Sequence, residues 1–426
     1  LCYQTDVAVE VDVLDRVPTP FGLLRYGVAP DHLKMKSLAV GLQRVLDDDR
    51  VRLFGDVVIG TDLTVDELRE RYDAVVYATG AGADRALGVP GEDLPGSTSA
   101  AHFVSWYSGH PDVVEPPLSL RATGVAVLGL GNVAVDVARI LVKSADVLSS
   151  TDMPDDVLEA LRSSPVTDVH LVGRRGPAQA RWTLKELREL GELEGVDVVV
   201  QEQDLVLSEA DEAVLASDSA VARTVAVLRQ WVGRPLTGAP RRLHLHFWAQ
   251  PERVLGDDAV TGLRLATSAG AHGTGTVDLD VQHVVRSVGF TGVPVPGIPF
   301  DEATGTIPSD GEGRVLRDGT PSRGEYVAGW AVRGPSGVIG TNRPDGELVA
   351  AALLADVADL PERGRSGADA LPALLAERGR RPVDLSGWAA IDAAEIARGA
   401  AQGRPRAKLS RYDDLRGACL AAVAAP

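Results

Sequence analysis

The spacing of apolar and polar residues over positions 124–140 predicts a strand, a glycine-rich turn and a helix in direct succession. Four consecutive apolar residues at 125–128 are typical of a buried parallel strand. After the turn, apolar side chains recur at Val133, Val137 and Ile140, which is the spacing of one helix face. This stretch therefore predicts one strand–turn–helix unit of an α/β fold.

The turn of this unit carries the pattern Gly-x-Gly-x-x-Ala. Gly129 permits the tight turn, Gly131 lets a pyrophosphate approach the backbone, and Ala134 allows the helix to pack closely on the strand. The helix N-terminus offers N–H groups and a partial positive charge to such an anion. We therefore expect a dinucleotide here rather than a chance glycine turn, and the expected binding residues are Gly129, Gly131, Asn132, Val133 and Ala134.

Two arginines follow the next predicted strand, at 169–172. A unit that binds NAD usually ends this strand with an Asp or Glu, which takes the ribose hydroxyls. Arg174 and Arg175 stand there instead, and guanidinium groups bind a 2′-phosphate that a carboxylate would repel. The pair favours NADPH, and the alternative is a solvated arginine pair in a loop.

Apolar periodicity predicts further elements on both sides of this unit. Strands are expected at 7–14, 51–59, 74–78, 241–248 and 280–288, and helices at 37–46, 64–71, 182–190, 208–231 and from about 345. Thr64 and Glu67 form a predicted capping box. Residues 144–165 are rich in Ser, Asp and Pro, and we expect them to be a surface insertion.

Two strand ends, at 79–80 and 287–289, each follow an apolar strand and precede chain rich in Pro and Gly. We predict that they are the two crossings between an outer domain and an inserted domain. The outer domain is then discontinuous, with residues 1–83 and 292–426, and the inserted domain is continuous, with residues 84–291.

Composition narrows the class of protein. The 426 residues are 45% hydrophobic, which is ample for two or three domains. A net charge of −17 argues against nucleic acid as a partner, and no apolar run is long enough for an integral membrane segment. Cys2 and Cys419 form neither a CxxC pair nor a disulfide framework. The eight histidines show no metal-ligand spacing, so we expect no metal site and a reduced, cytoplasmic protein.

Asp15 follows the predicted strand at 7–14, where a dinucleotide-binding fold places the acid that takes the ribose hydroxyls. No glycine motif precedes this strand. If Asp15 has that role, we expect about 25 residues of strand, glycine turn and helix to be absent ahead of it.

Five motifs occur along the chain in order: Pro20-Phe21-Gly22-Leu23, Gly27-Val28-Ala29-Pro30-Asp31-His32, Gly131-Asn132-Val133-Ala134, Gly173-Arg174-Arg175-Gly176-Pro177 and Arg333-Gly334-Pro335-Ser336-Gly337-Val338-Ile339. Together they resemble the adrenodoxin-reductase-type NADPH–ferredoxin reductases, a family of FAD flavoproteins. The resemblance runs from about Val7 to Leu409. It implies two Rossmann-like dinucleotide-binding domains, with the NADPH domain inserted into a discontinuous FAD domain.

The resemblance also implies roles for individual residues. Asp15 would take the FAD ribose, and the other FAD contacts would be Leu23, Ile59, Trp330, Gly337, Val338 and Ile339. The turn at 129–134, the pair Arg174 and Arg175, and Glu186 would bind NADPH. His32 and Glu189 match polar positions beside the nicotinamide and the flavin, and they are the candidate catalytic residues.

The implied activity is electron transfer from NADPH through FAD to a ferredoxin-type iron–sulfur protein. One alternative is an NADPH-dependent flavin oxidoreductase with a small-molecule acceptor, and another is a non-catalytic nucleotide-binding relic without FAD. The richest basic cluster of the inserted domain is either a ferredoxin docking site or a solvated loop, and it consists of Arg234, Arg241, Arg242, His244 and His246.

Overall fold

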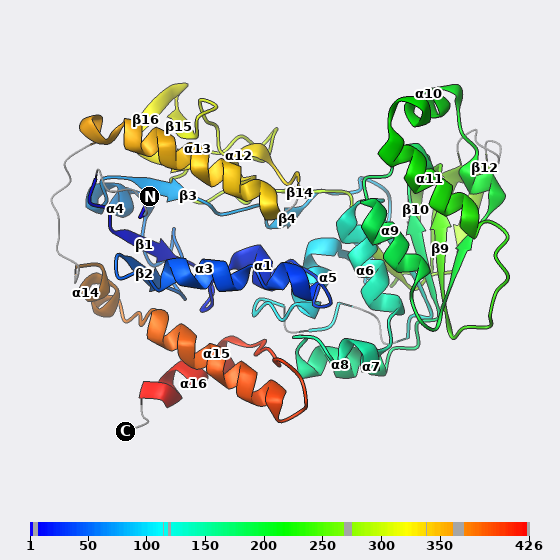
Figure 1. The fold of residues 1–426 in the computed structure, drawn as a ribbon, viewed down its shortest axis with the longest axis horizontal. Coiled ribbons are helices and arrows are strands. Elements are labelled where there is room, and N and C mark those ends of the chain that lie inside the picture. The colour runs from blue at the N-terminus through cyan, green and yellow to red at the C-terminus, as the bar shows by residue number, and fades with distance from the viewer. Residues whose placement is uncertain are drawn as a thin grey trace.

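The computed structural model describes residues 1–2, 7–113, 115–117, 121–267, 275–337, 339–360 and 370–423. Figure 1 shows a large sheet with its helices at one end of the molecule and several smaller sheets with long helices at the other. We refer to these as the inner part and the outer part. The arrangement is α/β, as the sequence predicts.

The inner part is built on one sheet that contains six strands among the described residues. In spatial order they are β5 (Ser97–Ser99), β13 (His283–Arg286), β6 (Gly124–Leu128), β7 (Asp168–Val172), β9 (Arg241–His246) and β8 (Val196–Val200). Every neighbouring pair is parallel. The carboxyl ends of these strands therefore meet at one edge of the sheet, where α/β proteins bind their ligands.

Helices cover one face of this sheet, and a second sheet lies on part of the other. The helices of the inner part are α5 (Ala100–Tyr107), α6 (Asn132–Val142), α7 (Ala145–Leu148), α8 (Asp155–Arg162), η1 (Pro177–Gln179), α9 (Leu184–Gly191), η2 (Glu202–Leu205), α10 (Glu209–Ser217) and α11 (Ser219–Trp231). The largest apolar core lies between these helices and the sheet. The antiparallel strands of the second sheet pack a smaller core against the opposite face, and they are β10 (Ala249–Leu255), β11 (Gly262–Thr267) and β12 (Gly275–Leu279).

The outer part contains a parallel pair of strands and a three-stranded sheet. Its strands are β1 (Val11–Leu14), β2 (Val51–Phe54), β3 (Val75–Tyr77), β15 (Arg314–Arg317) and β16 (Thr320–Val327). Its helices before the inner part are α1 (Gly22–Tyr26), α2 (Leu33–Lys36), α3 (Ala39–Leu46) and α4 (Val65–Arg71). After the inner part come α12 (Trp330–Arg333), η3 (Ile339–Thr341), α13 (Asn342–Ala355), η4 (Val357–Asp359), α14 (Ala370–Glu377), α15 (Leu385–Ala400) and α16 (Tyr412–Val423).

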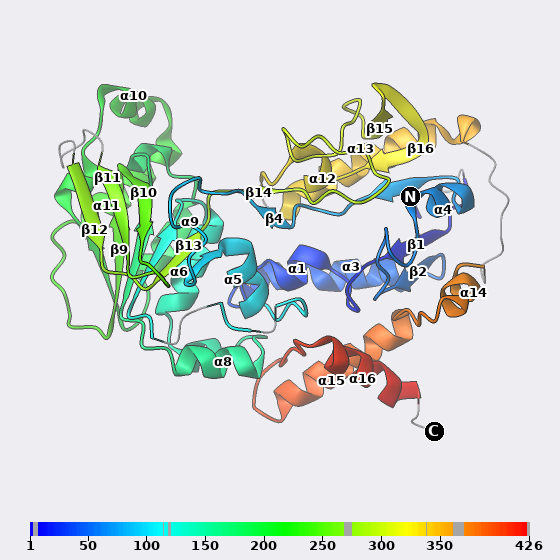
Figure 2. The same cartoon turned by 180° about the vertical axis from the view of Figure 1, so that it is seen from behind.

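A narrow antiparallel ribbon joins the two parts. It consists of β4 (Ala83–Asp84) and β14 (Phe290–Thr291), and Figures 1 and 2 show it between the inner sheet and the outer sheets. The ribbon forms where the sequence predicts the two crossings. We propose that the domain boundaries lie within it, which retains the predicted divisions 1–83, 84–291 and 292–426.

Buried ions hold the C-terminal segment against both parts. Arg25 pairs with Glu395 of α15, and the two side chains are 5% and 0% exposed. The ammonium group of Lys408 donates hydrogen bonds to the carbonyl oxygens of Arg25 at 2.7 Å and Ser108 at 3.0 Å, and it lies 3.2 Å from Asp152. The C-terminal segment thus packs into the core through these buried contacts.

Several predicted elements differ from the structure. The helix predicted at 208–231 is two helices, because the backbone of Asp218 is extended and its carboxylate caps the second one through the N–H groups of Ala220 and Val221. The segment 144–165, predicted to be a surface insertion, forms α7 and α8. Its side chains Asp146 and Glu159 are exposed, whereas its apolar residues Leu148 and Met153 are fully buried and pack against the main core.

Other boundaries shift by a few residues. The strand predicted at 51–59 ends at Phe54, and Asp56 with its positive φ turns the chain. The strand predicted at 280–288 is limited to residues 283–286. The capping box at Thr64 and Glu67 is confirmed. Within the described ranges, no helix has the length and apolar character needed to cross a bilayer.

Candidate functional site

The turn between β6 and α6 has the shape of an anion cradle. Gly129 has a φ of 141°, and a Cβ there would lie 2.3 Å from the carbonyl oxygen of Ser287, so the fold itself requires glycine. A Cβ at Gly131 would meet no atom within 4 Å. Gly131 is also the N-cap of α6, and no side chain caps this helix. Its first-turn N–H groups are therefore available to a phosphate.

The other predicted residues of the turn support this cradle. Ala134 is fully buried, which brings α6 close to the sheet as predicted. Val133 packs partly buried against the main core. The side-chain oxygen of Asn132 accepts a hydrogen bond from the backbone N–H of Thr183 at 3.2 Å, and Thr183 is the N-cap of α9. The cradle and the start of α9 are thus held together.

The arginine pair lies beside the cradle. Arg174 and Arg175 are exposed on the turn that follows β7, the strand next to β6. The N–H of Gly129 donates to the carbonyl oxygen of Val172 at 2.8 Å, which ties the two turns together at the carboxyl edge of the sheet. Two positive charges therefore border the site where a phosphate would bind.

A cluster of buried and partly buried polar side chains lies between α2, α6 and α9. Ligand-type atoms of His32, Glu186 and Glu189 all lie within 4.8 Å of one another. Nε2 of His32 is 3.0 Å from a carboxylate oxygen of Asp136 and 2.8 Å from a guanidinium nitrogen of Arg139. The two predicted catalytic residues are thus brought together with the predicted NADPH contact Glu186.

Arg139 is the central charge of this cluster. Its side chain is 1% exposed, and it donates to both carboxylate oxygens of Asp31 at 2.8 and 3.0 Å and to Glu186 at 3.2 Å. Burial raises the pKa of Glu186. Burial alone would also raise the pKa of Asp31, but hydrogen bonds from Arg139 and Lys143 hold that pKa below its usual range. The hydrogen bond to Asp136 raises the pKa of His32.

Sequence reasoning did not assign a role to Asp31, Asp136 or Arg139. Asp31 was part of a motif, but Asp136 and Arg139 belong to an otherwise apolar helix. The available signal was that charged residues stand in the buried part of α6, where an unpaired charge would be costly. Their partners lie on α2 and α9, so only the packing of distant segments reveals the cluster.

The predicted FAD residues at the start of the chain lie on three elements of the outer part. Asp15 follows β1, and one carboxylate oxygen accepts the N–H of Val17 at 3.1 Å. Burial raises the pKa of Asp15 to about 6. Leu23 is 40% exposed on α1, and Ile59 is partly buried between two small apolar clusters. A glycine turn ahead of β1 stays a prediction.

The second predicted FAD segment is organised by Arg333. This guanidinium donates to Asp345 at 2.7 Å and to Asn342 at 2.6 Å, and it also contacts the carbonyl oxygen of Ser336. Arg333 thereby fixes the loop before α13. The indole N–H of Trp330 donates to Ser336 as well, at 3.2 Å, and its ring stacks with Phe290 at 6.3 Å.

The remaining residues of that segment have different positions. Gly337 is exposed with a φ of 83°, and a Cβ there would lie 2.6 Å from the hydroxyl of Thr341. Ile339 begins η3. Val338 lies outside the described residues.

The predicted basic cluster is less free than its sequence indicates. Arg241 donates to the carbonyl oxygens of Val142 and Lys143 at the end of α6, so it has a structural role. Arg242 pairs with Asp168 at 2.7 Å. Docking of a partner at this cluster stays a prediction, but these two charges are already engaged.

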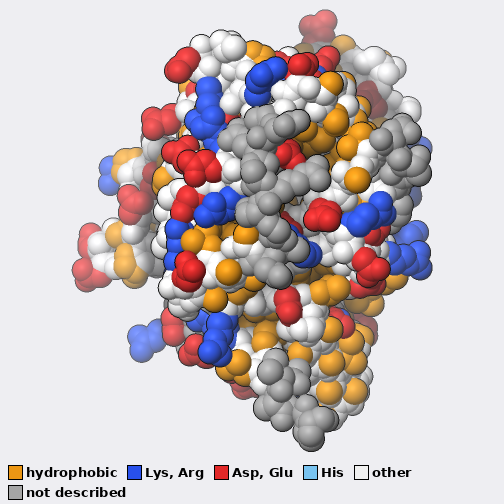
Figure 3. All heavy atoms as spheres, turned by 90° about the vertical axis from the view of Figure 1, so that its left-hand side faces the viewer, with side chains coloured by type: hydrophobic (Ala, Val, Ile, Leu, Met, Phe, Trp, Pro, Cys, Tyr) orange, Lys and Arg blue, Asp and Glu red, His pale blue; other side chains and the backbone are white. Residues whose placement is uncertain are grey.

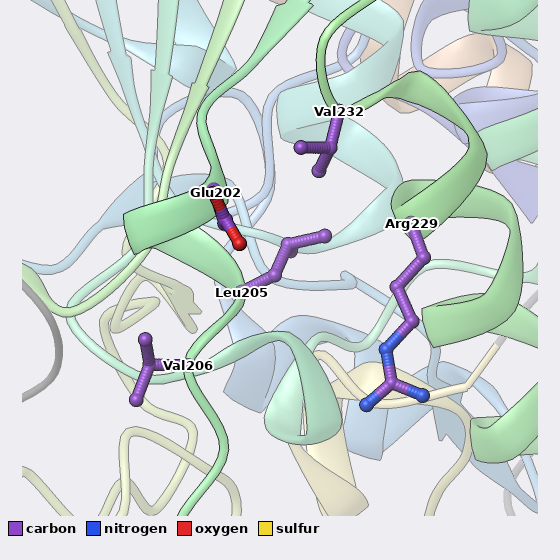
Figure 4. A pocket seen from close by; sticks show the side chains of 5 residues that line it. All are labelled: Glu202, Leu205, Val206, Arg229 and Val232. Atoms are coloured by element: carbon purple, nitrogen blue, oxygen red, sulfur yellow. The ribbon is translucent and has the colours of Figure 1, made fainter.

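A separate surface pocket of about 340 Å³ lies on the inner part. Figure 4 shows that Glu202 and Arg229 line different sides of it, with apolar side chains from Leu205, Val206 and Val232. None of the predicted site residues lines this pocket, so its volume does not mark the candidate site.

Comparison with known proteins gives a consistent result. No family model matches the chain. The chain is 43% identical over 423 residues to the NADPH-ferredoxin reductase FprA of Mycobacterium leprae, which covers 96% of this chain and 91% of that protein. It is 39% identical to the mitochondrial NADPH:adrenodoxin oxidoreductase of Arabidopsis thaliana, with 95% of this chain and 89% of that protein covered.

A solved structure is also similar over almost the whole chain. It is that of Mycobacterium tuberculosis FprA in complex with NADPH, with a TM-score of 0.89 and 41% identity. The match covers 98% of this chain and 94% of the solved one. The similarity therefore extends over both the inner part and the outer part.

Proposed function

The chain belongs to the family of NADPH–ferredoxin and NADPH–adrenodoxin reductases, and we propose that it transfers electrons from NADPH through FAD to a ferredoxin-type iron–sulfur protein. It is an NADPH-dependent oxidoreductase. The observation that carries the choice of nucleotide is the open cradle at Gly131, joined at the same sheet edge to Arg174 and Arg175. A cradle alone would bind the pyrophosphate of either NADH or NADPH, whereas the arginine pair supports NADPH, which carries the additional 2′-phosphate.

The residues of the inner part would bind and orient NADPH. The first-turn N–H groups of α6 would hold the pyrophosphate, and Arg174 and Arg175 the 2′-phosphate. Asn132 fixes the start of α9 relative to this cradle, so Glu186 and Glu189 are positioned by the same element that binds the nucleotide. This coupling supports the predicted roles of both glutamates.

The residues of the outer part would hold FAD. The carboxylate of Asp15 would accept hydrogen bonds from the hydroxyl groups of the FAD ribose, and the loop ordered by Arg333 would lie along the isoalloxazine ring. FAD held there would supply the capacity to take up two electrons as a hydride and to pass them on singly. Leu23, with its 40% exposure, offers an apolar contact, and Ile59, Trp330, Gly337, Val338 and Ile339 belong to the same proposal.

His32 and Glu189 are the proposed catalytic residues. His32 is held between α6 and α9, and it can carry a proton at Nε2 when that atom donates to Asp136. Glu189 pairs with Lys185 at 3.1 Å on the exposed side of α9. His32 and Glu189 would hold or move a proton close to the place where the nicotinamide and flavin rings meet, while the packed helices exclude water.

The decisive experiment uses the purified holoenzyme with three acceptors in parallel. Steady-state NADPH oxidation is measured with a ferredoxin, with a small-molecule dye and with no acceptor. The proposal expects ferredoxin reduction with a kcat/KM well above that for the dye. Efficient dye reduction without ferredoxin reduction would favour a small-molecule acceptor. Protein that is purified without flavin and gives no turnover with any acceptor would favour the relic.

The docking surface and the location in the cell complete the proposal. Acidic ferredoxins favour a locally basic site. Figure 3 shows the end of the outer part, where basic and acidic side chains are interspersed among hydrophobic ones, so this face presents no field of one sign.

We propose the cytoplasm as the location, which imaging of a fluorescent fusion of the chain tests.

A further inference from the structure

Three histidines that are distant in sequence meet on the inner sheet. His170 lies on β7, and His244 and His246 lie on the neighbouring strand β9, with His170 directly opposite His244 in the register. The imidazole of His170 stacks on that of His244 at 4.5 Å and on that of His246 at 5.3 Å between centroids. Their spacing in the sequence does not show this proximity, which arises from the order of the strands in the sheet.

The cluster lies on the sheet face opposite the main core. Val169 and Leu171 flank His170 on β7 and pack against the helices, so strand alternation directs His170 to the other face. His244 and His246 alternate with Leu243 and Leu245 on β9 in the same way. All three histidines are only partly exposed, because the sheet of β10 to β12 covers the neighbouring part of this face.

The nitrogens of two of these rings are almost at the spacing of metal ligands. Nδ1 of His170 lies 3.0 Å from Nε2 of His246. Two nitrogens bound to one tetrahedral zinc ion at 2.0–2.1 Å are about 3.3 Å apart. A metal ion could therefore replace the proton between these two atoms with a shift of a few tenths of an ångström.

The third histidine already has the outer partner that a metal ligand requires. Nε2 of His244 lies 2.8 Å from a carboxylate oxygen of Asp168. Metal-bound histidines usually donate their second N–H to such a group, which fixes the ring. With Nε2–H donated to Asp168, Nδ1 of His244 is the free ligand atom. This ring must turn to reach the ion, because the three rings stack and do not yet converge within 4.8 Å.

A transition-metal ion binds the neutral form of imidazole. Burial lowers the pKa of His170 to about 3, and positive charge on His244 or His246 would lower that pKa further. Arg242 lies on the same strand as His244 and His246, and its guanidinium is engaged by Asp168 at 2.7 Å.

We propose that His170, His244 and His246 form a binding site for a transition-metal ion of the Zn²⁺ class, supported by Asp168, which ties β7 to β9. A water molecule would complete the tetrahedron. This site is separate from His32, Glu186 and Glu189, where the guanidinium of Arg139 already supplies a positive charge.

The test is a calorimetric titration of Zn²⁺ into chelator-treated holoenzyme. The wild type is expected to bind one ion that the double variant His170→Gln/His246→Gln does not bind, whereas His32→Gln, the matched control in the other cluster, still binds it. Asp168→Asn is expected to weaken binding about 10- to 100-fold. Zinc should also raise the melting temperature of the wild type and of His32→Gln, but not that of the double variant.

X-ray absorption at the zinc edge gives a readout that needs no variant. Three imidazoles around the ion in wild-type protein would support the proposal even if the double variant fails to fold. A zinc ion coordinated by one imidazole and two carboxylates would instead lie at His32, and this result would overturn the proposal. The proposal is equally wrong if a folded double variant binds zinc as tightly as the wild type does.

Discussion

Nε2 of His32 lies between a group that can only donate and a group that can only accept. It is 2.8 Å from a guanidinium nitrogen of Arg139 and 3.0 Å from a carboxylate oxygen of Asp136. Without a proton, Nε2 can accept from Arg139, and with a proton it can donate to Asp136. The protonation of one atom thus decides which partner His32 binds, at the junction of the two predicted domains.

The first prediction concerns the pH dependence of stability in His32→Gln. The hydrogen bond to Asp136 raises the pKa of His32, so its protonated form stabilises the folded chain below the unfolded pKa, and this stabilisation is lost as pH rises through the folded pKa. We expect the variant to be less stable than the wild type near pH 6 by about 1.5–3 kcal/mol, with a smaller difference near pH 9. Urea unfolding at both pH values measures this, and a difference that grows with pH would contradict it.

The second prediction concerns the choice of nucleotide. Arg174→Ala and Arg175→Ala are each expected to weaken NADPH binding about ten- to a hundredfold and to leave NADH binding nearly unchanged, because a charge-assisted contact to phosphate is worth about 1.5–3 kcal/mol. Arg188→Ala, an exposed arginine on α9, is the matched control. Calorimetry with both nucleotides tests this, and equal losses for the two would show that the pair is structural.

The third prediction concerns Asp15, whose pKa burial raises to about 6. The protonated carboxyl stabilises the folded chain below about pH 4, and this contribution is lost as pH rises through about 6. In flavin-free protein, Asp15→Asn should therefore become more stable than the wild type as pH rises, by up to about 3 kcal/mol at pH 7. Asp66→Asn, with an exposed carboxylate, should show no such trend.

The same variant should have the opposite effect on the cofactor. An amide accepts ribose hydroxyls less well than a carboxylate does, so Asp15→Asn should bind FAD more weakly while its flavin-free form is more stable. Flavin fluorescence titration measures the affinity. Unchanged affinity together with the stability gain would remove Asp15 from the proposed FAD site.

The fourth prediction concerns the buried pair Arg25 and Glu395. Arg25→Met leaves Glu395 buried with Arg406 as its remaining arginine, and we expect a loss of about 3–5 kcal/mol in the free energy of unfolding. Arg398→Ala breaks an exposed pair with Asp155 and should cost less than about 1 kcal/mol. Chemical denaturation compares them, and equal effects would show that the buried pair contributes no more than a surface one.

Features set by neighbouring residues were the ones that could be predicted. The turn at Gly129 and Gly131 follows from a local change in hydrophobic period, and the structure has its strand and helix at the expected places. The capping box at Thr64 is equally local. Such features need no knowledge of how distant segments pack.

The features that were missed depend on strand order and helix packing. In the sheet, β9 lies between β7 and β8, although β8 comes before β9 in the sequence. His244 on β9 is therefore next to His170 on β7, even though the edge strand β8 separates them along the chain. No spacing in the sequence shows this order. Arg139 likewise pairs with Asp31 across the junction of the two parts, and this contact between distant segments can be seen only once the helices are packed.

The tail contacts also set an order of assembly during synthesis. The inner sheet has its last strand when Arg286 has been made, so the inner part can close its core while the chain is still growing. Arg404 and Lys408, which contact the carbonyl of Thr151 and the carboxylate of Asp152, are synthesised only after the whole inner part. The inner part is therefore expected to acquire its native packing first and its fixed position against the rest of the protein last.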